Sequence, residues 1–469
     1  MNFYVNEKQF QAGYSIKKNA REAKKVLMLC YYFPPFCSSI EGSGVQRPLK
    51  FAQYLPDSGY EPIILTIDRG DSGSYGHELL NNLPDTIKIY RTKPAIRYKN
   101  RVKIAAGNNN IKDNNRPNNK FSLFYNLIKK NILSPLYYKF YMRWFLTFPD
   151  GQIFWLWPAY KNALNIIIKE KIDLIFTTSA PYTSHLIGYL LKKRTNKSWI
   201  VDFRDEWSGN PYKKYASNIH FIINKKLEKK VLMFADKIIT VSPCLSEHFR
   251  SLINNQNEKI TTISNGYDDM NNNNFRIETN FTSSSNKFII TYLGVFYKEL
   301  RTPKQFLYGI EYLIKNKLID PEHLQIIFVG DRYKIENSNI QHLIKQTGYL
   351  NYEQAREYMV NTTLLLNIEP NSQRTYPGKL FDYISTGKPI LSLCSKNSDT
   401  ANLLQKVELG YIAEPNDIPN IASQIQILYN KWKQNDLEKH PNWYEINKYT
   451  RKNLTKQLAN VFDKLLHYK

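Results

Sequence analysis

The stretch that decides the fold is Tyr376-Pro377-Gly378-Lys379-Leu380-Phe381-Asp382-Tyr383-Ile384-Ser385-Thr386-Gly387-Lys388-Pro389-Ile390-Leu391. An apolar run at 362–368 precedes it and is typical of a buried strand. Pro377 is predicted to open a helix, because proline lacks only an N–H that has no partner at a helix start. Gly387 and Pro389 end that helix, and a second apolar strand begins at Ile390. The stretch therefore predicts a strand–helix–strand unit of a parallel α/β fold.

The same stretch carries groups that suit a phosphorylated sugar. The turn at Pro377 and Gly378 offers backbone N–H groups at the positive end of a helix, which favours a phosphate. Lys379 adds a positive charge, and Asp382 lies over the same helical face, where it can accept hydrogen bonds from sugar hydroxyls. Together these groups indicate a nucleotide-sugar site. The alternative is an ordinary connection in which Asp382 only favours the helix dipole.

Length and composition indicate a globular protein of two domains. The 469 residues exceed what one hydrophobic core usually fills. The cysteines have no paired or metal-ligand spacing, so we expect a reducing compartment, no disulfide framework and no metal site. No apolar signal segment opens the chain, and no apolar run is long enough to span a bilayer. We therefore expect a cytoplasmic protein.

The net charge of +24 requires an explanation. Nucleic acid, an anionic membrane surface and anionic substrates each attract a basic protein. A compositional alternative is an AT-rich coding sequence, since Asn, Ile, Lys and Tyr are all abundant and Asn occurs in runs at 108–110 and 271–274. The basic residues are spread out, and no RRM, KH, zinc-finger or basic-zipper signature is present. We therefore predict no nucleic-acid partner.

The order of the apolar runs predicts how the two domains are divided. Residues 1–23 are predicted to be a polar extension, and 24–266 alternate short apolar strands with helical periods. The stretch 267–287, rich in Asn, Ser, Thr and Asp, is predicted to be a linker. A second α/β series occupies 288–442, and 443–469 is predicted to be an amphipathic helix.

The segment Tyr-Pro-Gly-Lys-Leu-Phe-Asp-Tyr, followed by Ser-Thr-Gly-Lys-Pro, resembles the donor-binding motif of glycosyltransferase family 4 of the bacterial surface-polysaccharide type. Similar segments recur over nearly the whole chain. The resemblance implies the GT-B fold, in which two Rossmann-like domains face each other across a cleft and the last helix returns to the first domain. It also implies a retaining, metal-independent transfer of a sugar from a UDP or GDP donor, with no further cofactor, to a saccharide or lipid-linked saccharide acceptor.

A glycine-containing loop in the first domain, Gly42-Ser43-Gly44-Val45-Gln46-Arg47, follows the first strand and precedes a helical pattern. Glycines at such a place let the backbone approach an anionic group closely. The resemblance assigns Gly42 and Gly44 to the donor diphosphate and adds the charge of Arg47 on the acceptor side. The alternative is a flexible turn with a solvated Arg47.

The run Asp202-Phe203-Arg204-Asp205-Glu206-Trp207 follows a predicted strand, and charges at such an edge often mark a ligand site in α/β folds. The run resembles a family segment in which a nearby histidine faces the reacting centre. Asp205 is the nearest match and is predicted to be catalytic, either contacting the donor sugar or orienting the acceptor. Asp202, Arg204 and the upstream His185 are predicted on the acceptor side. The alternatives are a structural Arg204–Asp202 pair and a helix-start role for His185.

The resemblance places further donor contacts in the second domain. Arg301 fits a cation that holds the β-phosphate, so Arg301 and Lys379 are the predicted stabilisers of the leaving group. Val295, after Gly294, stands where arginine is common, so that cationic contact is absent or is supplied by Lys298. The residues predicted to line the donor pocket are Gly294, Gly330, Tyr349, Pro377 and Gly378.

Two glutamates separated by seven residues mark the family, and this chain departs from both. Asp382 matches the later glutamate and is predicted to bind ribose. Arg374 stands at the earlier one and cannot accept hydrogen bonds, so Glu369 is predicted to substitute. These departures keep a catalytically impaired GT-B scaffold open as an alternative, with a nucleotide-sugar epimerase on the same fold as a further one.

Residues 121–157 mix aromatic and aliphatic side chains with Lys and Arg, which suits the headgroup boundary of a membrane. Pro135 prevents one long spanning helix, and the basic stretch 97–120 adds attraction to anionic lipid. The prediction is reversible, peripheral binding to the inner face of the plasma membrane. The alternative is a helix packed in the first domain with a solvated basic face.

Overall fold

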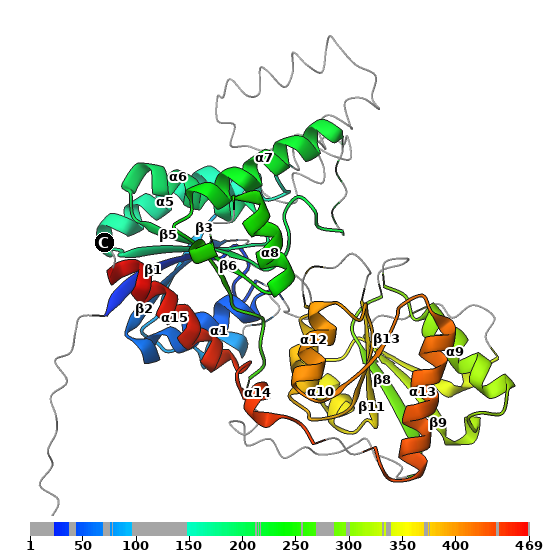
Figure 1. Cartoon of the computed structure of the whole chain (residues 1–469). Helices are drawn as coiled ribbons and strands as arrows, with labels where there is room; N and C mark the ends of the chain where they lie inside the picture. Colours follow the sequence, from blue (N-terminus) through cyan, green and yellow to red (C-terminus); the bar gives the residue numbers. More distant parts are fainter. Residues whose placement is uncertain are drawn as a thin grey trace, which may run out of the picture.

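Two series of apolar strands alternate with helices and build two separate parallel sheets (Figure 1). The structure is a computed structural model. It describes residues 23–36, 44–68, 76, 78–95, 148–211, 213, 215, 217–254, 257–268, 286–296, 301–330, 333, 339–369, 374, 376–437 and 440–467. Among these residues the first sheet has seven strands and the second has six. The two-domain α/β prediction is confirmed.

The first sheet has the order β3-β2-β1-β4-β5-β6-β7, with every neighbouring pair parallel. Its strands are β1 (Lys24–Leu29), β2 (Tyr60–Ile67), β3 (Lys88–Thr92), β4 (Leu174–Thr178), β5 (Ser198–Phe203), β6 (Lys237–Thr240) and β7 (Ile260–Thr262). The chain first adds β2 and β3 on one side of β1, and then adds β4, β5, β6 and β7 on the other side. The strand order therefore reverses between β1 and β4, a point where such sheets commonly bind ligands.

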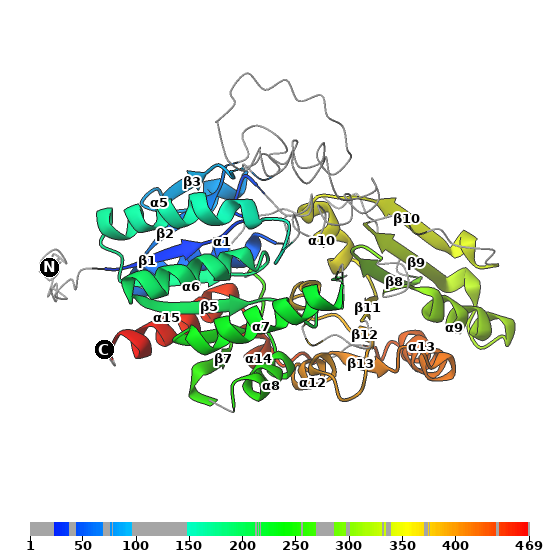
Figure 2. The same cartoon turned by 90° about the horizontal axis from the view of Figure 1, so that it is seen from above.

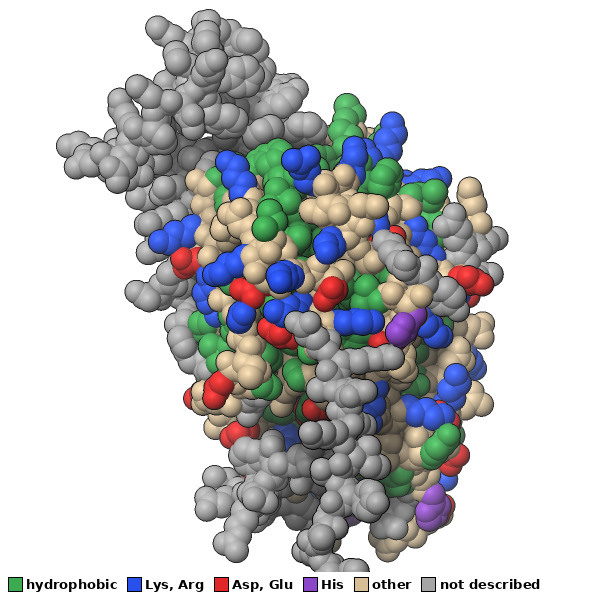
Figure 3. Space-filling model, turned by 90° about the vertical axis from the view of Figure 1, so that its left-hand side faces the viewer, with side chains coloured by type: hydrophobic (Ala, Val, Ile, Leu, Met, Phe, Trp, Pro, Cys, Tyr) green, Lys and Arg blue, Asp and Glu red, His purple; other side chains and the backbone are tan. Residues whose placement is uncertain are grey.

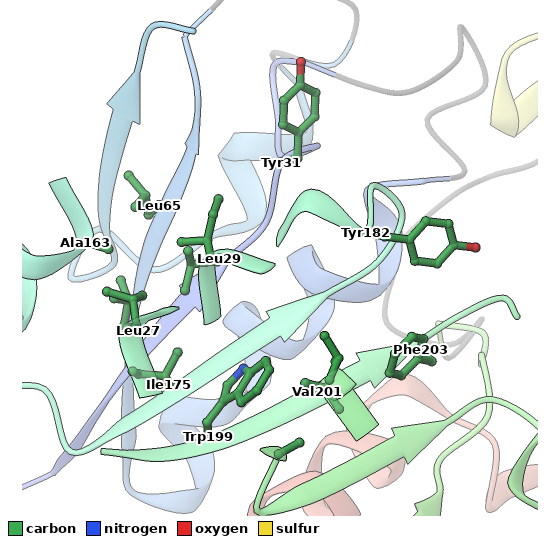
Figure 4. Close-up of a cluster of buried hydrophobic side chains, with 14 of the residues drawn as sticks. Leu27, Leu29, Tyr31, Leu65, Ala163, Ile175, Tyr182, Trp199, Val201 and Phe203 are labelled. Atoms are coloured by element: carbon green, nitrogen blue, oxygen red, sulfur yellow. The ribbon is translucent and has the colours of Figure 1, made fainter. Parts of the chain in front are cut away.

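Helices cover both faces of the first sheet. One face carries α5 (Leu156–Lys169), α6 (Thr183–Thr195), α7 (Asn218–Phe234) and α8 (Pro243–Leu252), and the other carries α1 (Gln46–Tyr54) and α15 (Arg451–His467). Side chains alternate along β1, so that Leu27 and Leu29 pack under the first face and Val26 and Met28 under the second. Figure 4 shows Leu27, Ile175 and Trp199 meeting in the first of these cores. Burial on both faces explains why the strands are continuous apolar runs.

The second sheet has the order β10-β9-β8-β11-β12-β13 and is also parallel throughout. Its strands are β8 (Phe288–Leu293), β9 (Leu324–Val329), β10 (Ile344–Gly348), β11 (Leu364–Ile368), β12 (Ile390–Leu393) and β13 (Gly410–Ala413). One face is covered by α9 (Lys304–Lys315) and α13 (Ile418–Lys433), and the other by α10 (Tyr352–Val360), α11 (Lys379–Ile384) and α12 (Asp399–Lys406). The order reverses between β8 and β11.

The chain crosses between the domains twice, and the two crossings lie side by side. Tyr267 N–H donates to the carbonyl of Tyr449 (3.2 Å), and Arg451 N–H donates to the carbonyl of Tyr267 (2.9 Å). The predicted single helix at 443–469 is therefore two, α14 (Trp443–Asn447) and α15, because the intervening residues pair with the other crossing. As predicted, the final helix returns to the first domain, where it lies beside α1 (Figure 1). Figure 2 shows the same arrangement from above.

Several sequence predictions fall outside the described residues. These are nearly all of the extension 1–23 and the linker 267–287, together with Gly42, Lys298 and the part of the predicted membrane segment at 121–147. In the part of the chain that the structure describes, no helix is both long enough and apolar enough to cross a bilayer.

Gly188 marks the tightest helix-to-sheet contact of the first domain. A Cβ atom at this position would overlap the indole of Trp199 and the methyl group of Thr177. We expect Gly188→Ala to lower the free energy of unfolding by about 1–3 kcal/mol, the usual cost of overpacking. Urea or thermal unfolding measures this, with Lys193→Ala on the exposed side of the same helix as the control. Equal stability of the two variants would contradict the close packing at Gly188.

Candidate functional site

The carboxyl ends of the central strands in the second sheet bring the predicted donor residues together. Gly294 directly follows β8, and Glu369 directly follows β11, its neighbour across the reversal in strand order. The Nζ of Lys379, the first residue of α11, donates to the carbonyl of Leu293 (2.8 Å) and lies 3.4 Å from the centroid of the Tyr292 ring. The predicted cation is therefore held directly beside Gly294.

Three glycines at adjacent strand ends allow the backbone to come close together there. Gly294, Gly330 and Gly348 have φ values of 119°, 126° and 72°, in the left-handed region that side chains disfavour. A Cβ on Gly330 would meet the carbonyl oxygen of Gly294 at 2.7 Å. Gly294 N–H donates to Val329 (2.8 Å), and Gly330 N–H donates to Gly348 (3.0 Å). The backbone of the three strand ends therefore lies close together at this edge of the sheet, without side chains between them.

Glu369 is a buried carboxyl in the same group. Its Oε1 accepts hydrogen bonds from Thr400 Oγ1 (2.6 Å) and Asn367 Nδ2 (3.0 Å). Burial raises the pKa of Glu369 to about 7, although these hydrogen bonds and the charges of Arg301 and Lys379 act in the opposite direction. The charges of Arg301 and Lys379 thus both act on this one carboxyl. Glu369 changes its charge near neutral pH.

Asp382 lies on α11 but interacts with a different set of groups from Lys379. Tyr352 Oη, at the start of α10, donates to its Oδ1 (3.2 Å). Burial raises the pKa of the half-buried Asp382 carboxyl to about 6, while Arg451 and the Tyr352 hydrogen bond counteract that effect. Tyr349, three residues before Tyr352, is half exposed. Asp382 and the predicted base-binding region around Tyr349 therefore lie near each other. The charge of Arg451, at the second crossing between the domains, also acts on Asp382.

The helix start differs from the prediction made for Pro377. The helix begins at Lys379 with Gly378 as its N-cap, and Leu380 N–H donates to the carbonyl of Pro377 (3.0 Å). Pro377 thus precedes the helix. Its carbonyl accepts the Leu380 N–H, so this N–H is not available to a phosphate, as had been expected. Because α11 has six residues, its dipole is small. A phosphate here depends mainly on Lys379 and Arg301.

In the first domain, two of the predicted acceptor-side residues bind each other. Arg47 Nη2 lies 2.7 Å from Asp202 Oδ1, and Arg47 also donates to the carbonyls of Ile263 and Ser264. Both side chains are buried. The partner of Asp202 is thus Arg47 rather than Arg204, and the predictions of a solvated Arg47 and of an Arg204–Asp202 pair are wrong. A buried, fully paired ion pair holds α1 against β5 and leaves neither charge for a ligand.

Arg204 connects the loops at the reversal point of the first sheet. It donates to the backbone carbonyls of Gly44, Ser179 and Ala180. The described end of the glycine loop is therefore fixed to the end of β4. Asp205, the next residue, has a half-buried carboxyl whose pKa is raised by burial, with Arg204 acting in the opposite direction. Asp205 remains the predicted catalytic group of this domain.

His185 lies in the core. It is fully buried, its Nδ1 is 2.8 Å from Thr177 Oγ1, and its ring packs against Phe203. Burial lowers the pKa of His185 to about 3, so the ring is neutral. The acceptor-side prediction for His185 is therefore not supported by its position, and its place in the first turn of α6 fits the alternative.

Sequence reasoning missed an ion pair between the domains. Arg374 Nη1 lies 2.6 Å from Glu206 Oε2, and His248 Nε2 lies 3.0 Å from Glu206 Oε1. Burial disfavours ionisation of Glu206, but hydrogen bonds from His248 and Arg374 outweigh it and lower its pKa. Cys244 N–H adds a second link to Asp399 Oδ2 (2.7 Å). The one available signal was Arg374 itself, a cation where the family has a carboxylate; nothing in the sequence pointed to His248.

The described residues contain no group of three or more His, Cys, Asp or Glu side chains arranged to hold a metal ion.

Breaking the Arg47–Asp202 pair tests its structural role. We expect Arg47→Met to lower the free energy of unfolding by about 3–5 kcal/mol, because it leaves the Asp202 charge buried without its partner. The double variant Arg47→Met with Asp202→Asn removes both charges and should recover much of that loss. Urea unfolding measures all three proteins. An Arg47→Met variant as stable as the wild type would show that the pair is not what holds α1 to β5.

Glu369 gives the stability a characteristic dependence on pH. The pKa of Glu369 is raised from 4.5 to about 7 in the folded protein, so its proton stabilises the fold below pH 4.5, and this contribution is lost as the pH rises through 7. Between about pH 5.5 and about pH 8, we expect the free energy of unfolding of the wild type to fall by about 2 kcal/mol more than that of Glu369→Gln, as measured by urea unfolding at each pH. The glutamine keeps the oxygen that accepts both hydrogen bonds. If the free energy of unfolding of the two proteins changed in parallel with pH, the raised pKa of Glu369 would be contradicted.

The comparisons with known proteins agree with this architecture. Residues 129–270 match the model of Glycosyltransferase Family 4. No curated protein sequence matches the chain significantly. Sucrose-phosphate synthase from Thermosynechococcus elongatus is similar over 95% of this chain and 100% of its own, with 13% identity and a TM-score of 0.61. A glycosyltransferase from Rickettsia africae is similar over 95% of this chain and 99% of its own, with 16% identity and a TM-score of 0.59.

A third structure, HepE of Anabaena in complex with UDP and glucose, covers 94% of this chain and 99% of its own, with 13% identity and a TM-score of 0.56. Identities this low establish the fold alone. The two parallel sheets, the returning last helix and these structures agree on one architecture. The chain has the GT-B fold and resembles glycosyltransferase family 4.

Proposed function

We propose that this chain is a retaining glycosyltransferase that transfers a sugar from a UDP- or GDP-sugar to a saccharide acceptor. One observation carries the proposal: Lys379 is held at the carboxyl end of β8, beside three strand-end glycines with positive φ, and its charge and that of Arg301 both act on the Glu369 carboxyl at the end of β11. A diphosphate needs cations and close backbone, and this edge supplies both. The match to Glycosyltransferase Family 4 and the UDP and glucose in the HepE structure support the same ligand class.

In the proposed reaction, the bond between the sugar and the diphosphate breaks, and the acceptor hydroxyl oxygen forms the new bond to the sugar. The hydroxyl proton passes to the departing phosphate, on which negative charge develops as the first bond breaks. Lys379 and Arg301 stabilise that charge, so the chain itself supplies the electrostatic assistance. The ammonium of Lys379 is already positioned by the carbonyl of Leu293 and the ring of Tyr292, which limits the reorganisation needed when the charge develops. Asp382 accepts hydrogen bonds from the ribose hydroxyls, and Asp205 approaches the sugar from the first domain.

The acceptor in this proposal is a saccharide carried on a lipid and used for surface polysaccharide, so the protein works at an anionic membrane surface. The net charge of +24 supports that placement, because anionic lipid attracts a basic protein. The membrane segment predicted at 121–157 is described only from residue 148 and contributes nothing further here.

A second candidate, a GT-B scaffold without catalysis, is favoured by one observation. Arg374 occupies the place of a family carboxylate and is bound to Glu206 of the first domain, so it holds the domains together instead of accepting a hydrogen bond from the donor sugar. The two candidates differ in a simple way. A scaffold binds the nucleotide-sugar without consuming it, whereas the transferase also hydrolyses it slowly or transfers the sugar.

Removing either donor-site cation should abolish most of the activity while leaving the fold intact. We expect Lys379→Ala and Arg301→Ala each to lower turnover roughly ten- to a hundred-fold, the cost of one lost charge-assisted bond to phosphate. A panel of UDP- and GDP-sugars, read first by thermal shift and then by donor hydrolysis, identifies the substrate for this assay. Lys396→Ala, an exposed lysine of the same domain, is the control.

Wild-type kinetics in both variants would remove the donor-site assignment. Donor binding without hydrolysis or transfer in the wild type would favour the scaffold.

A further inference from the structure

The outer face of α7 combines lysine with large apolar side chains and carries no acidic residue. Its exposed positions recur with the helical period along the whole helix. They are Asn218, Ile219, Phe221, Ile222, Lys225, Lys226, Lys229, Lys230, Met233 and Phe234. Ile219 is 64% exposed and Phe234 is 46% exposed. Glu228, the acidic residue of this helix, faces inward and is fully buried.

The surface continues from α7 onto its neighbour α6. The rings of Phe234 and Tyr189 are 5.0 Å apart, and the amines of Lys230 and Lys193 lie 5.1 Å and 5.8 Å from the Tyr189 ring. Beyond the C-terminal end of α7 lies an open hollow of about 600 Å³, whose wall carries both acidic and basic side chains, Asp236 and Glu258 with Lys237 and Lys259, so the basic surface ends there. Figure 3 views the first domain from its outer end and shows blue and green side chains intermingled over the upper part of that face.

The buried face of the same helix holds the loop that carries Asp205. Glu228 Oε1 accepts the N–H of Trp207 (3.0 Å), and its carboxylate also accepts bonds from Ser208. Asn224 Oδ1 accepts the indole N–H of Trp207 (2.8 Å). The N-terminal end of α7 contacts the segment that precedes α5, since the rings of His220 and Phe148 are 5.5 Å apart. One helix therefore supports the candidate acceptor loop on one side and carries the basic, apolar surface on the other.

The composition of this surface favours a membrane over a protein partner. The cores of protein interfaces are depleted in lysine, whereas this face has four lysines at its centre and apolar groups at both ends. Lysine with Ile, Phe and Met on one helix suits the headgroup boundary, where the amines meet anionic groups and the apolar side chains enter the acyl region. No exposed acid on the helix opposes that attraction.

We propose that the outer face of α7, with Tyr189 and Lys193 of α6, docks on an anionic lipid bilayer, from which the lipid-linked acceptor reaches the Asp205 loop. The identity of the acceptor rests on the proposed function, but the docking surface itself does not. Electrostatic attraction brings the protein to the surface, and Ile219, Ile222 and Phe234 fix the orientation in which the acceptor loop lies close to the lipid.

Charge reversal on the outer face of α7 tests the docking surface. The full chain is sedimented with phosphatidylcholine vesicles, with and without phosphatidylglycerol, at low and high salt. We expect the wild type to bind only the anionic vesicles and to be released by salt. The double variant Lys226→Glu with Lys229→Glu should bind at least roughly 30-fold more weakly, since each lysine near an anionic surface contributes about fivefold and charge reversal adds repulsion to the loss of both. The matched control is Lys315→Glu with Lys433→Glu, exposed lysines of the second domain.

Two further measurements keep the result unambiguous. All three proteins should melt at the same temperature and give the same thermal shift with UDP-glucose or GDP-mannose, whichever the wild type binds. Anionic-vesicle binding by the α7 variant equal to that of the wild type would overturn the docking surface and indicate that another surface of the protein binds the lipid. A wild type that binds no nucleotide-sugar would instead count against the glycosyltransferase, without altering the vesicle result.

Discussion

Parallel pairing of β8 with both β9 and β11 is the constraint on which the candidate donor site depends. Parallel strands end at the same edge of a sheet, so the residues after β8, β9 and β11 meet although they are far apart in the sequence. Gly294, Gly330 and Glu369 all owe their positions to this pairing. Lys379 then needs only one hydrogen bond, to Leu293, to join them. The apolar residues of these strands form the core of the domain, and the candidate site residues follow the strands at their carboxyl ends.

Buried carboxyl groups occur in both domains. In the first domain, Arg47 and Asp202 neutralise each other, and three hydrogen-bond donors of the neighbouring loop bind Glu228. Burial nevertheless raises the pKa of Glu228 and of Asp205, as it raises those of Glu369 and Asp382 in the second domain. Raised carboxyl pKa values are therefore common to both domains, and what distinguishes Glu369 is its place at the end of β11, across from Gly294.

Much of the fold could be predicted from the sequence, because the runs of apolar residues and the Pro-Gly and Gly-Lys-Pro signals act locally. The convergence of Gly294 and Glu369 was also within reach, since each directly follows a recognisable strand, and Lys379 begins the helix that the Pro-Gly signal announces. The pairing of charges was not. Arg47 and Asp202 are separated by 155 positions, and Glu206 and Arg374 by 168. Periodicity shows which face of an element is buried, but it does not show which buried charges will meet. His185 illustrates the same limit, because only the packing of α6 decides that it faces the core.

The paired crossings at Tyr267 and Arg451 determine how the two domains can move. Two chain segments joined by hydrogen bonds bend together easily, but they slide past each other only if those bonds break. Rotation about the paired crossings is therefore the relative motion that leaves these hydrogen bonds intact. Lys50 and Arg451 both bind the Asp268 carboxylate at this point of the chain. The Glu206–Arg374 ion pair is a separate link between the two domains. A rotation that moves its two partners apart has to break this ion pair, so the pair favours the arrangement of the domains seen here.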